Sequence, residues 1–348
     1  MENISNLIEQ VRQLVLSARR EAFKNINHVQ LMAYFEIGGR IIMFEQAGKK
    51  RAEYGKKALA ELSDKLTGEF GRGFSRSNLE YMRKFYILYE PRISQTLSGK
   101  SQKIALPSTE ITQSFRLSWS HYVFLMGIKN IDERNFYEIE AANAGWSLNH
   151  LKRQYDSSLY ERLALSSDKK KWAKLSTEGL VLRESKDIVK NPLVLEFLGL
   201  EEKTSYSESE LESAIIDKLE HFLLELGKGF LFEARQKRFS FGTDHFFVDL
   251  VFYNRLLRCY VLIDLKIGRL VHQDIGQMQM YVNYFDRFEK KDFENPTIGI
   301  ILCKSKHDAL VELTLPKDTK IFATEYQMYL PSKEELKRKL MEWSEEEK

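Results

Sequence analysis

The sequence predicts an all-α N-terminal half followed by an α/β C-terminal half. In the first half, apolar residues recur every three or four positions, which is the spacing of one face of a helix. After residue 230, runs rich in Val, Ile, Phe and Tyr end at turns that contain Gly or Asn, as strands do. We therefore expect a helical domain over residues 1–165, a polar, lysine-containing linker over 166–190 and a sheet domain over 191–348.

The helical half has a glycine-containing turn between two of its helices. Residues 71–75 interrupt the apolar pattern, and Ser75 is a good N-cap for the next helix. A helix, a short turn with glycine and a second helix are typical of a helix-turn-helix. Residues 91–114, rich in Ser, Thr, Gln and Lys, are expected to form an exposed loop. The expected helices cover residues 4–23, 29–44, 54–70, 76–89, 118–128, 132–144 and 147–163.

The second half is expected to contain a sheet with helices packed on it. Ser207 and Glu210 form a capping box before a helix over residues 211–226. A further helix is expected over 273–285. The expected strands cover residues 230–241, 245–253, 256–266 and 297–304, with a short one over 320–323.

The composition is that of a soluble protein, with 348 residues of which 30% are charged and 43% hydrophobic. No apolar run is long enough to cross a bilayer and the N-terminus lacks the plan of a signal peptide, so we expect a cytoplasmic protein. The two cysteines, Cys259 and Cys303, fall in expected strands, which argues against a disulfide framework or a zinc cluster. The net charge of +3 does not by itself indicate a nucleic-acid partner, and nothing indicates a small-molecule cofactor.

Ionisable residues interrupt two of the expected strands. Asp249 lies between apolar residues of one strand, and Asp264 and Lys266 end the next. Residues two apart in a strand point to the same face, so Asp264 and Lys266 project together and Leu265 points away. Buried charges are costly unless they are paired, so this layout suits a divalent cation with a lysine beside it. The alternative is a buried Asp264–Lys266 ion pair that serves only the fold, which leaves Asp249 unexplained.

These residues resemble the motif of the PD-(D/E)xK nuclease superfamily, with Asp249 as the first acid and Asp264-Leu265-Lys266 as the D/E-x-K. Glu212 lies on the inward stripe of the preceding helix, where these nucleases carry an acidic residue. Gln277 and Tyr281 lie four apart in the later helix and match the Q-x-x-x-Y element of RecB-like branches. Val248 departs from the proline of the motif name, and Asp264 stands where many relatives carry glutamate.

Nearly the whole chain is also similar to the YhcG-like family of bacterial proteins, which joins a helical N-terminal domain to a PD-(D/E)xK domain. The similar stretches are AYFEIGGRI, GFSRSNLEYMRKFY, LSWSHYVFL, PLVLEFLGL, ELGKGFLFEARQKRF and GQMQMY. This resemblance implies a restriction-endonuclease-like α/β fold for the C-terminal domain and DNA recognition or dimerisation, as a homodimer, for the helical domain.

The resemblance also implies the roles of the site residues. Asp249, Asp264 and the main-chain carbonyl of Leu265 would hold Mg²⁺, or Mn²⁺ in its place, because these cations prefer oxygen ligands. Glu212 would hold a metal-bound water or a second cation, and Lys266 would orient or deprotonate the attacking water. Gln277 and Tyr281 would position the phosphate or the lysine. The alternative for the last pair is a helix face that only packs on the sheet.

Two groups of basic residues are candidates for binding nucleic acid. One lies at the end of the first long strand and the other surrounds the predicted second helix of the helix-turn-helix. The alternatives are a charged strand edge for the first group and an ordinary bundle helix for the second, with Tyr81, Phe85 and Tyr86 packing in its core. The candidates are Arg235, Gln236, Lys237 and Arg238, and Arg72, Arg76, Arg83 and Lys84, with Asn78 beside them.

The function that the sequence predicts is hydrolysis of DNA phosphodiester bonds by a magnesium-dependent nuclease, in DNA processing, repair or defence against foreign DNA. Two alternatives stay open. The first is a protein that binds nucleic acid with a nuclease fold but does not cut it, although the intact acidic and lysine set argues against this. The second is an RNA endonuclease, which the same residues would serve.

Overall fold

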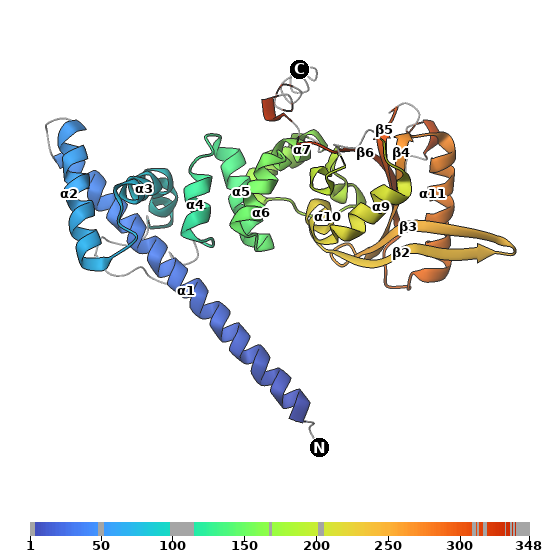
Figure 1. The fold of residues 1–348 in the computed structure, drawn as a ribbon, viewed down its shortest axis with the longest axis horizontal. Coiled ribbons are helices and arrows are strands. Elements are labelled where there is room, and N and C mark those ends of the chain that lie inside the picture. Colours follow the sequence, from blue (N-terminus) through green and yellow to red (C-terminus); the bar gives the residue numbers. More distant parts are fainter. Residues whose placement is uncertain are drawn as a thin grey trace. The chain divides into compact units, whose positions relative to one another are not determined.

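The computed structural model describes residues 4–47, 52–97, 115–166, 169–200, 205–307, 311, 313–315, 319–330, 332–334, 336 and 338 (Figure 1). The chain divides into two compact units, Met1–Leu148 and Asn149–Lys348. This division falls earlier than the predicted domain boundary at residue 165. None of the helices in the described ranges has the length and apolar character needed to cross a bilayer.

The first unit is helical, and its first helix is longer than predicted. The first helix, α1, is continuous over Ile4–Ala47, so the prediction of separate helices over 4–23 and 29–44 is wrong. The residues between the two predicted helices include neither Gly nor Pro, and nothing local ends the helix. The other helices of this unit are α2 (Ala52–Phe70), α3 (Arg76–Leu97), α4 (Trp119–Leu125) and α5 (Ile131–Ala144).

Helix α3 extends into the segment that was predicted to be a loop. It continues through Pro91 to Leu97, so the predicted loop begins too early, and residues 98–114 lie outside the described residues. Proline in a helix removes one backbone hydrogen bond and crowds the preceding turn, but neighbouring residues can continue the helix with a kink.

The turn between α2 and α3 has the predicted chemistry. Gly71 and Gly73 both have positive φ, the region that glycine adopts without a steric penalty. Ser75 Oγ accepts a hydrogen bond from the backbone N–H of Asn78, which confirms the N-cap. The Asn78 side chain donates to the Gly73 carbonyl and accepts from Trp119 Nε1 at 2.8 Å. Asn78 therefore fixes the turn, and the idea that it contacts phosphates loses its support.

The core of the first unit is rich in aromatic residues and depends on close contact between α1 and α3. Gly38 lies against Met82, where a Cβ would approach the Met82 main-chain oxygen to 2.1 Å. Phe85 is fully buried, as expected if the α3 aromatic residues pack in the core of a helical bundle. Tyr81, in contrast, is exposed. Rings in mutual contact around Phe85 are those of Phe35, Tyr89, Phe115, Trp119 and Tyr122.

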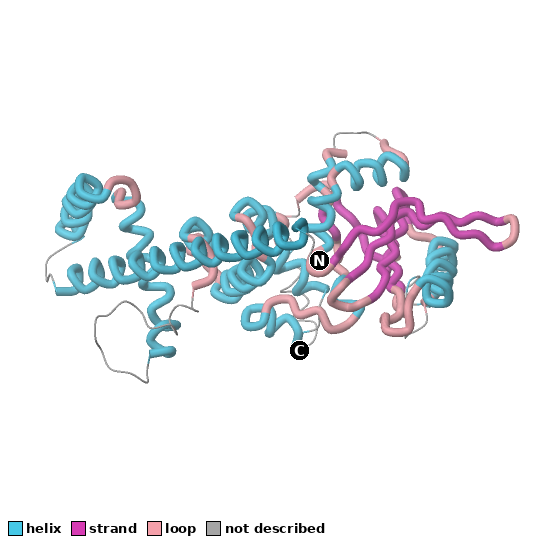
Figure 2. Tube along the Cα trace, turned by 90° about the horizontal axis from the view of Figure 1, so that it is seen from below, coloured by secondary structure: helices cyan, strands magenta, loops and turns pink. Residues whose placement is uncertain are grey.

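The second unit contains a six-stranded mixed sheet in the order β1-β6-β5-β4-β3-β2 (Figure 2). Pairing is antiparallel from β2 through β4 and parallel from β4 through β1. The strands are β1 (Leu193–Val194), β2 (Phe230–Phe241), β3 (Asp244–Asn254), β4 (Cys259–Arg269), β5 (Ile298–Ser305) and β6 (Ile321–Gln327). The helices are α6 (Leu148–Asp156), α7 (Leu159–Ser166), α8 (Lys169–Glu178), α9 (Glu208–Asp217), α10 (Leu219–Leu226) and α11 (His272–Tyr284), with shorter turns at Ser185–Ile188, Glu196–Leu198 and Phe285–Glu289.

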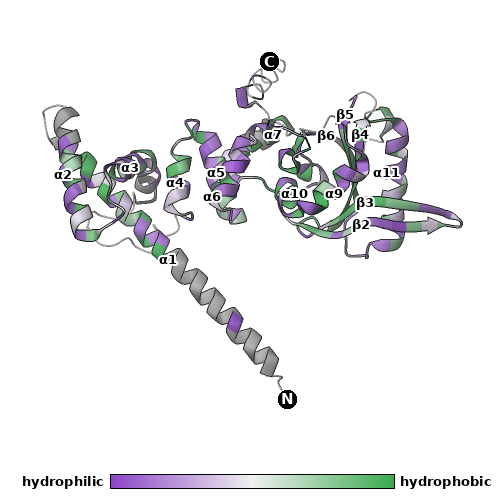
Figure 3. Ribbon diagram, in the orientation of Figure 1, coloured by the Kyte–Doolittle hydropathy of each residue, from purple (hydrophilic) through white to green (hydrophobic). Residues whose placement is uncertain are grey.

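Helices cover both faces of this sheet. The α9 and α10 side has a core that includes Phe222, Leu250 and Ile263, and the α11 side has one that includes Val251 and Met278 (Figure 3). The outer half of the β2–β3 hairpin extends beyond the rest of the sheet (Figures 1 and 2). Pairing of β3 with β4 is confined to the inner part of β3, from Leu250 to Asn254.

Several predicted boundaries in the second unit need correction. The helix predicted over 211–226 is broken at Lys218 into α9 and α10. The predicted strand over 256–266 starts later, because Asn254 Oδ1 accepts the N–H groups of Leu256 and Leu257 and holds them in a turn. The predicted linker contains α8, and β1 had not been predicted.

A buried charge network attaches α6 and α7 to the second unit. Arg162 and Glu225 are both fully buried, and their side chains lie 2.6 Å apart. Arg153 of α6 pairs with Glu225 at 3.3 Å, and Lys190 donates to the Glu225 carbonyl. Burial raises the pKa of Glu225, but Arg162, Lys190 and Arg153 outweigh it and lower the pKa to about 2. These contacts explain why the compact unit begins before residue 165.

We predict that Gly38→Ala destabilises the protein by about 1–3 kcal/mol, because the new methyl group would overlap the backbone of α3. The matched control is Gly68→Ala in α2, where a Cβ would meet nothing within 4 Å. That variant should gain up to about 1 kcal/mol from helix propensity. Urea denaturation monitored by circular dichroism measures both changes. Equal effects of the two substitutions would contradict the close α1–α3 contact.

Candidate active site

Asp264 and Lys266 lie together on β4, as the strand period predicted. Asp264 is 2% exposed, and its Oδ2 atom is 2.8 Å from Nζ of Lys266. Among the described residues no other donor approaches this oxygen. Leu265 points away into the core beneath α9 and α10. A carboxylate with a buried oxygen that lacks further donors is thus held next to an ammonium group.

Asp249 lies on β3 and is tied to β4 directly. Its Oδ2 atom accepts the backbone N–H of Leu265 at 2.8 Å. This bond brings the first acid of the predicted motif to the D-x-K segment, because Leu265 stands between Asp264 and Lys266. The charge of Asp249 adds to the effect of burial in raising the pKa of Asp264.

Glu212 is on the first turns of α9, behind the predicted capping box of Ser207 and Glu210. Its side chain is buried, as its inward stripe predicted, and both of its oxygens accept hydrogen bonds. Arg235 Nε donates to Oε1, and Gln236 Nε2 donates to Oε2 at 2.7 Å. Gln236 Nε2 also donates to Asp249 Oδ1 at 3.0 Å, so one amide joins Glu212 to Asp249.

Gln277 and Tyr281 lie on the same face of α11, as predicted from their spacing. The Gln277 amide donates to the Tyr281 hydroxyl, and Tyr281 is 1% exposed. Burial raises the pKa of Tyr281, and the charges of Asp264 and Asp249 add to this effect. The Tyr281 ring also packs edge-on against Phe239. Tyr281 therefore makes a polar contact, as the nuclease motif implied, and also packs on the sheet, as the alternative interpretation proposed.

The environment of the site raises the pKa of both aspartates. Burial raises the pKa of Asp264 from 3.8 to about 7, with Lys266 opposing this effect and Asp249 adding to it. Burial also raises the pKa of Asp249. Lys266 is affected in both directions: burial lowers its pKa, but Asp264, Glu208 and Asp249 outweigh burial and raise it.

The donor set fits a hard divalent cation at Asp249 and Asp264. Both are oxygen donors, one oxygen of Asp264 lacks further donors, and a cation would relieve the repulsion between the two carboxylates. Across the described ranges, however, no group of three His, Cys, Asp or Glu side chains converges to hold a metal. Glu212 is bound by Arg235 and Gln236, so two carboxylates are the side-chain ligands that this geometry offers directly.

The predicted basic run at the end of β2 is not one surface. Arg235 pairs with Glu212 and contacts Ser213, and Gln236 joins Glu212 to Asp249. Lys237 pairs with Glu289 at 3.7 Å on the α11 side. Arg238 is exposed and contacts the His245 ring at about 3 Å from both ring nitrogens. Arg235, Gln236 and Arg238 are all exposed, but Arg235 and Gln236 bind the acids, whereas Arg238 contacts His245 on the hairpin.

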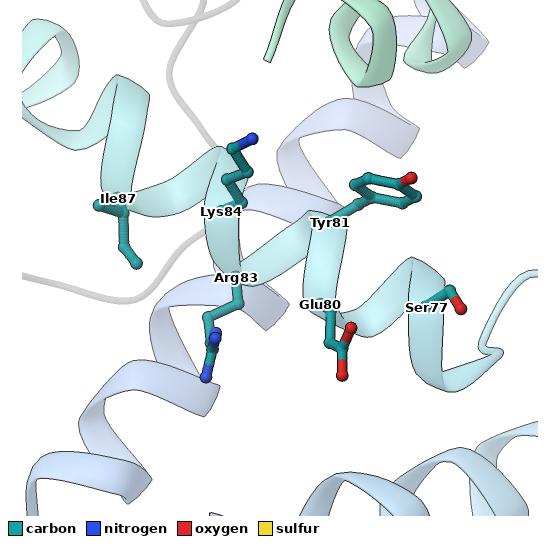
Figure 4. Close-up of a pocket in the computed structure, with 6 residues that line it drawn as sticks. All are labelled: Ser77, Glu80, Tyr81, Arg83, Lys84 and Ile87. Carbon is teal, nitrogen blue, oxygen red and sulfur yellow. The ribbon is translucent and has the colours of Figure 1, made fainter. Parts of the chain in front are cut away.

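The basic residues around α3 also differ from one another (Figure 4). Arg76 pairs with Glu80 at 3.4 Å, and Arg83 pairs with Glu45 of α1 at 2.8 Å. Lys84 and Arg72 are exposed, and Lys84 points away from Arg83 in Figure 4. A surface pocket on this helix is lined by Ser77, Glu80, Tyr81, Arg83, Lys84 and Ile87.

Sequence reasoning missed Glu208 at the site, and it assigned Gln236 to nucleic-acid binding and not to the acids. Glu208 lies 3.9 Å from Lys266, and Gln236 holds two acids together. The spacing of Glu208 and Glu212, four apart on one helix face, is a signal that could have found the first. No sequence signal indicated the second, because it depends on a local distortion of β2.

We predict that, in EDTA, the melting temperature of Asp264→Asn minus that of the wild type increases as the pH rises. The raised pKa means that the folded protein holds a proton that the unfolded chain has already released. The folded wild type is therefore increasingly destabilised by the buried Asp264 between about pH 4 and about pH 7. Asparagine does not ionise, so Asp264→Asn lacks this destabilisation. Calorimetry across this range measures the difference. A melting-temperature difference that does not change with pH would contradict the assignment.

Comparison with known proteins shows the family of the chain. Residues 186–341 match the family described as "YhcG PDDEXK nuclease domain", and residues 10–162 match the "DUF1016 N-terminal domain". The chain is 39% identical over 347 residues to the Escherichia coli (strain K12) protein named "Putative nuclease YhcG", with 94% of this chain and 91% of that protein covered.

Two solved structures show weaker similarity to part of the chain. One is a repair endonuclease from Pyrococcus abyssi, with 18% identity, 37% of this chain and 51% of that chain covered, and a TM-score of 0.26. The other is titled as a complex of EndoMS with dsDNA, with 19% identity, 38% and 49% covered, and a TM-score of 0.26. At this level neither similarity indicates a substrate. The family matches and the near full-length identity show that the chain belongs to the YhcG family and that its C-terminal part is a nuclease domain of the PD-(D/E)xK type, with the corresponding restriction-endonuclease-like fold.

Proposed function

We propose that this nuclease uses Mg²⁺, or Mn²⁺ in its place, to hydrolyse phosphodiester bonds of DNA. The observation that carries the proposal is the pairing of Asp264 with Lys266 in a buried place to which Asp249 is tied through the Leu265 N–H. Two acids that share a dry site are destabilising without a cation, and a fold that needed only an ion pair would not retain the second acid.

Each residue has a role that follows from its position. Asp249, Asp264 and the main-chain carbonyl of Leu265 would hold the cation, with Glu212 beside them as an acceptor for an ordered water. The cation supplies charge stabilisation and a lowered pKa for water. Lys266 would donate to the attacking water or to a phosphate oxygen, since its ammonium group stays charged beside Asp264.

A path for the substrate leads along the outer face of the β2–β3 hairpin. Phe239 packs against Phe246 and against Tyr281 of α11, so this cross-strand pair faces α11. The adjacent cross-strand pair, Arg238 and Phe247, faces the opposite side of the hairpin because neighbouring residues in a strand alternate. Phe247 is 44% exposed, and the neighbouring Ser240 and His245 are also exposed. A cation, small polar groups and an exposed ring are suited to phosphates and base faces.

The helical unit offers a second contact with DNA. Its α2–turn–α3 segment has helix-turn-helix order, and α3 presents Lys84 and Tyr81 outward (Figure 4). Phosphates would be met by Arg72 and Lys84, since Arg76 and Arg83 already pair with acids. These contacts are consistent with a role in DNA processing, repair or defence.

We predict that Lys266→Ala and Asp264→Ala each lower the cleavage rate by about 100-fold or more while binding of nucleic acid is retained, because phosphate contacts elsewhere supply the affinity. Labelled duplex, junction, single-stranded DNA and RNA are incubated with pure protein in Mg²⁺, Mn²⁺ or EDTA. Undiminished cutting by either variant would remove the site assignment. Cutting of RNA alone would replace DNA with RNA as the substrate.

We predict that Arg72→Ala combined with Lys84→Ala weakens DNA binding and lowers the slope of log K against log salt by about two, one for each lost phosphate contact. Arg83→Ala is the matched control, because Arg83 pairs with Glu45. Fluorescence anisotropy over a salt series measures the slope. An unchanged slope in the double variant would show that α3 does not meet the DNA backbone.

A further inference from the structure

One residue in β2 has a backbone conformation that strands rarely contain. Gln236 has φ 47°, in the left-handed region, and it is neither Gly nor Asn. The β2–β3 ladder is interrupted at this point: Arg235 pairs with Leu250 and Lys237 with Val248, while Gln236 and Asp249 between them form no ladder pair. The left-handed conformation costs conformational energy, which surrounding contacts must offset.

The distortion changes which way the side chains point. Successive residues in a regular strand lie on opposite faces, so Arg235 and Gln236 should not reach the same group. In this structure Arg235 Nε donates to one oxygen of Glu212 and Gln236 Nε2 donates to the other. The left-handed turn of the backbone is what allows two consecutive residues to bind one carboxylate.

Gln236 also joins two acids that repel each other. Its Nε2 atom lies 2.7 Å from Glu212 Oε2 and 3.0 Å from Asp249 Oδ1. A primary amide has two N–H groups, one for each carboxylate, and it adds no charge that would compete with a cation. Glutamate at this position would add a third acid, and lysine would neutralise the site.

We infer that Gln236, with Arg235, is a positioning residue that holds Glu212 at a fixed separation from Asp249. This inference rests on the proposed function and deepens it, since it assigns both residues, which are exposed, to holding the acids and not to binding phosphates. Groups that fix the orientation of metal-binding carboxylates affect turnover by about 10–100-fold. The left-handed backbone is retained because it delivers the amide to both acids.

The test compares Gln236→Gly with Arg258→Gly. Arg258 is a second non-glycine residue with positive φ, at 50°, and it lies in the turn before β4, away from the acids. Both substitutions relax the same kind of backbone, but Gln236→Gly also removes the hydrogen bonds to Glu212 and Asp249, so Arg258→Gly controls for the backbone change alone. Cleavage of DNA in Mg²⁺ should show that Gln236→Gly lowers kcat by about 10–100-fold with little change in KM, whereas Arg258→Gly leaves both unchanged.

A second pair of variants separates positioning from DNA contact. Arg235→Ala should lower kcat, whereas Arg238→Ala, on the exposed hairpin face, should raise KM. If Gln236→Gly does not fold, Gln236→Asn keeps an amide and a residue tolerant of left-handed φ but shortens the reach, and it should show the same loss of kcat. A kcat that stays at the wild-type value, or a change confined to KM, in Gln236→Gly or Gln236→Asn overturns the inference.

A measurement without substrate distinguishes failure of the inference from failure of the proposed function. In EDTA, melting temperatures of wild type, Gln236→Gly, Glu212→Gln and the double variant form a cycle. The two changes are expected to be non-additive, because Gln236→Gly removes the donor of the Gln236–Glu212 hydrogen bond and Glu212→Gln removes the charge of its acceptor. Additive changes overturn the positioning role even if the protein cuts DNA. Non-additive changes with no cutting of any nucleic acid would leave the positioning role intact and overturn the proposed function.

Discussion

The arrangement of the second unit depends on the burial of one carboxylate, that of Asp264, in a central strand of the sheet. Its neighbours Ile263 and Leu265 are fully buried, so the strand cannot turn this residue to solvent without exposing them. Burial of an ionised group is costly, and the groups that offset it come from elsewhere in the chain. Lys266 supplies a charge from the same strand, and Asp249 arrives from β3 through the Leu265 N–H. The site is therefore a consequence of strand order and not of one local motif.

The sequence predicted the parts of this site that follow from periodicity. A period of two placed Asp264 and Lys266 on one face, and a spacing of four placed Gln277 and Tyr281 on one face of α11. The bounds of β2 also agree with the predicted strand. Parts that depend on distant contacts were missed. The two residues of β1 gain strand structure through pairing with β6, which no local pattern indicates.

The basic run from Arg235 to Arg238 shows how a local conformation can change the meaning of a sequence pattern. Four polar residues in a row suggest one exposed edge, but a single left-handed residue resets the alternation of the strand. Arg235 and Gln236 bind the acids although both are exposed, Lys237 pairs with Glu289, and Arg238 contacts His245. Left-handed φ in a glutamine cannot be read from residue type, because glycine and asparagine are the usual signals for it.

The buried pair of Arg162 and Glu225 bears on where the nuclease part of the chain begins. The nuclease family match starts at residue 186, whereas Arg162 is the last residue of the N-terminal match. Glu225 is fully buried, and its lowered pKa depends first on Arg162 and then on Lys190 and Arg153. A fragment that began at residue 186 would keep the buried Glu225 carboxylate of α10 and lose both arginines. Removing one partner of a buried ion pair is strongly destabilising, so the sheet that carries the acids requires α6 and α7 as well.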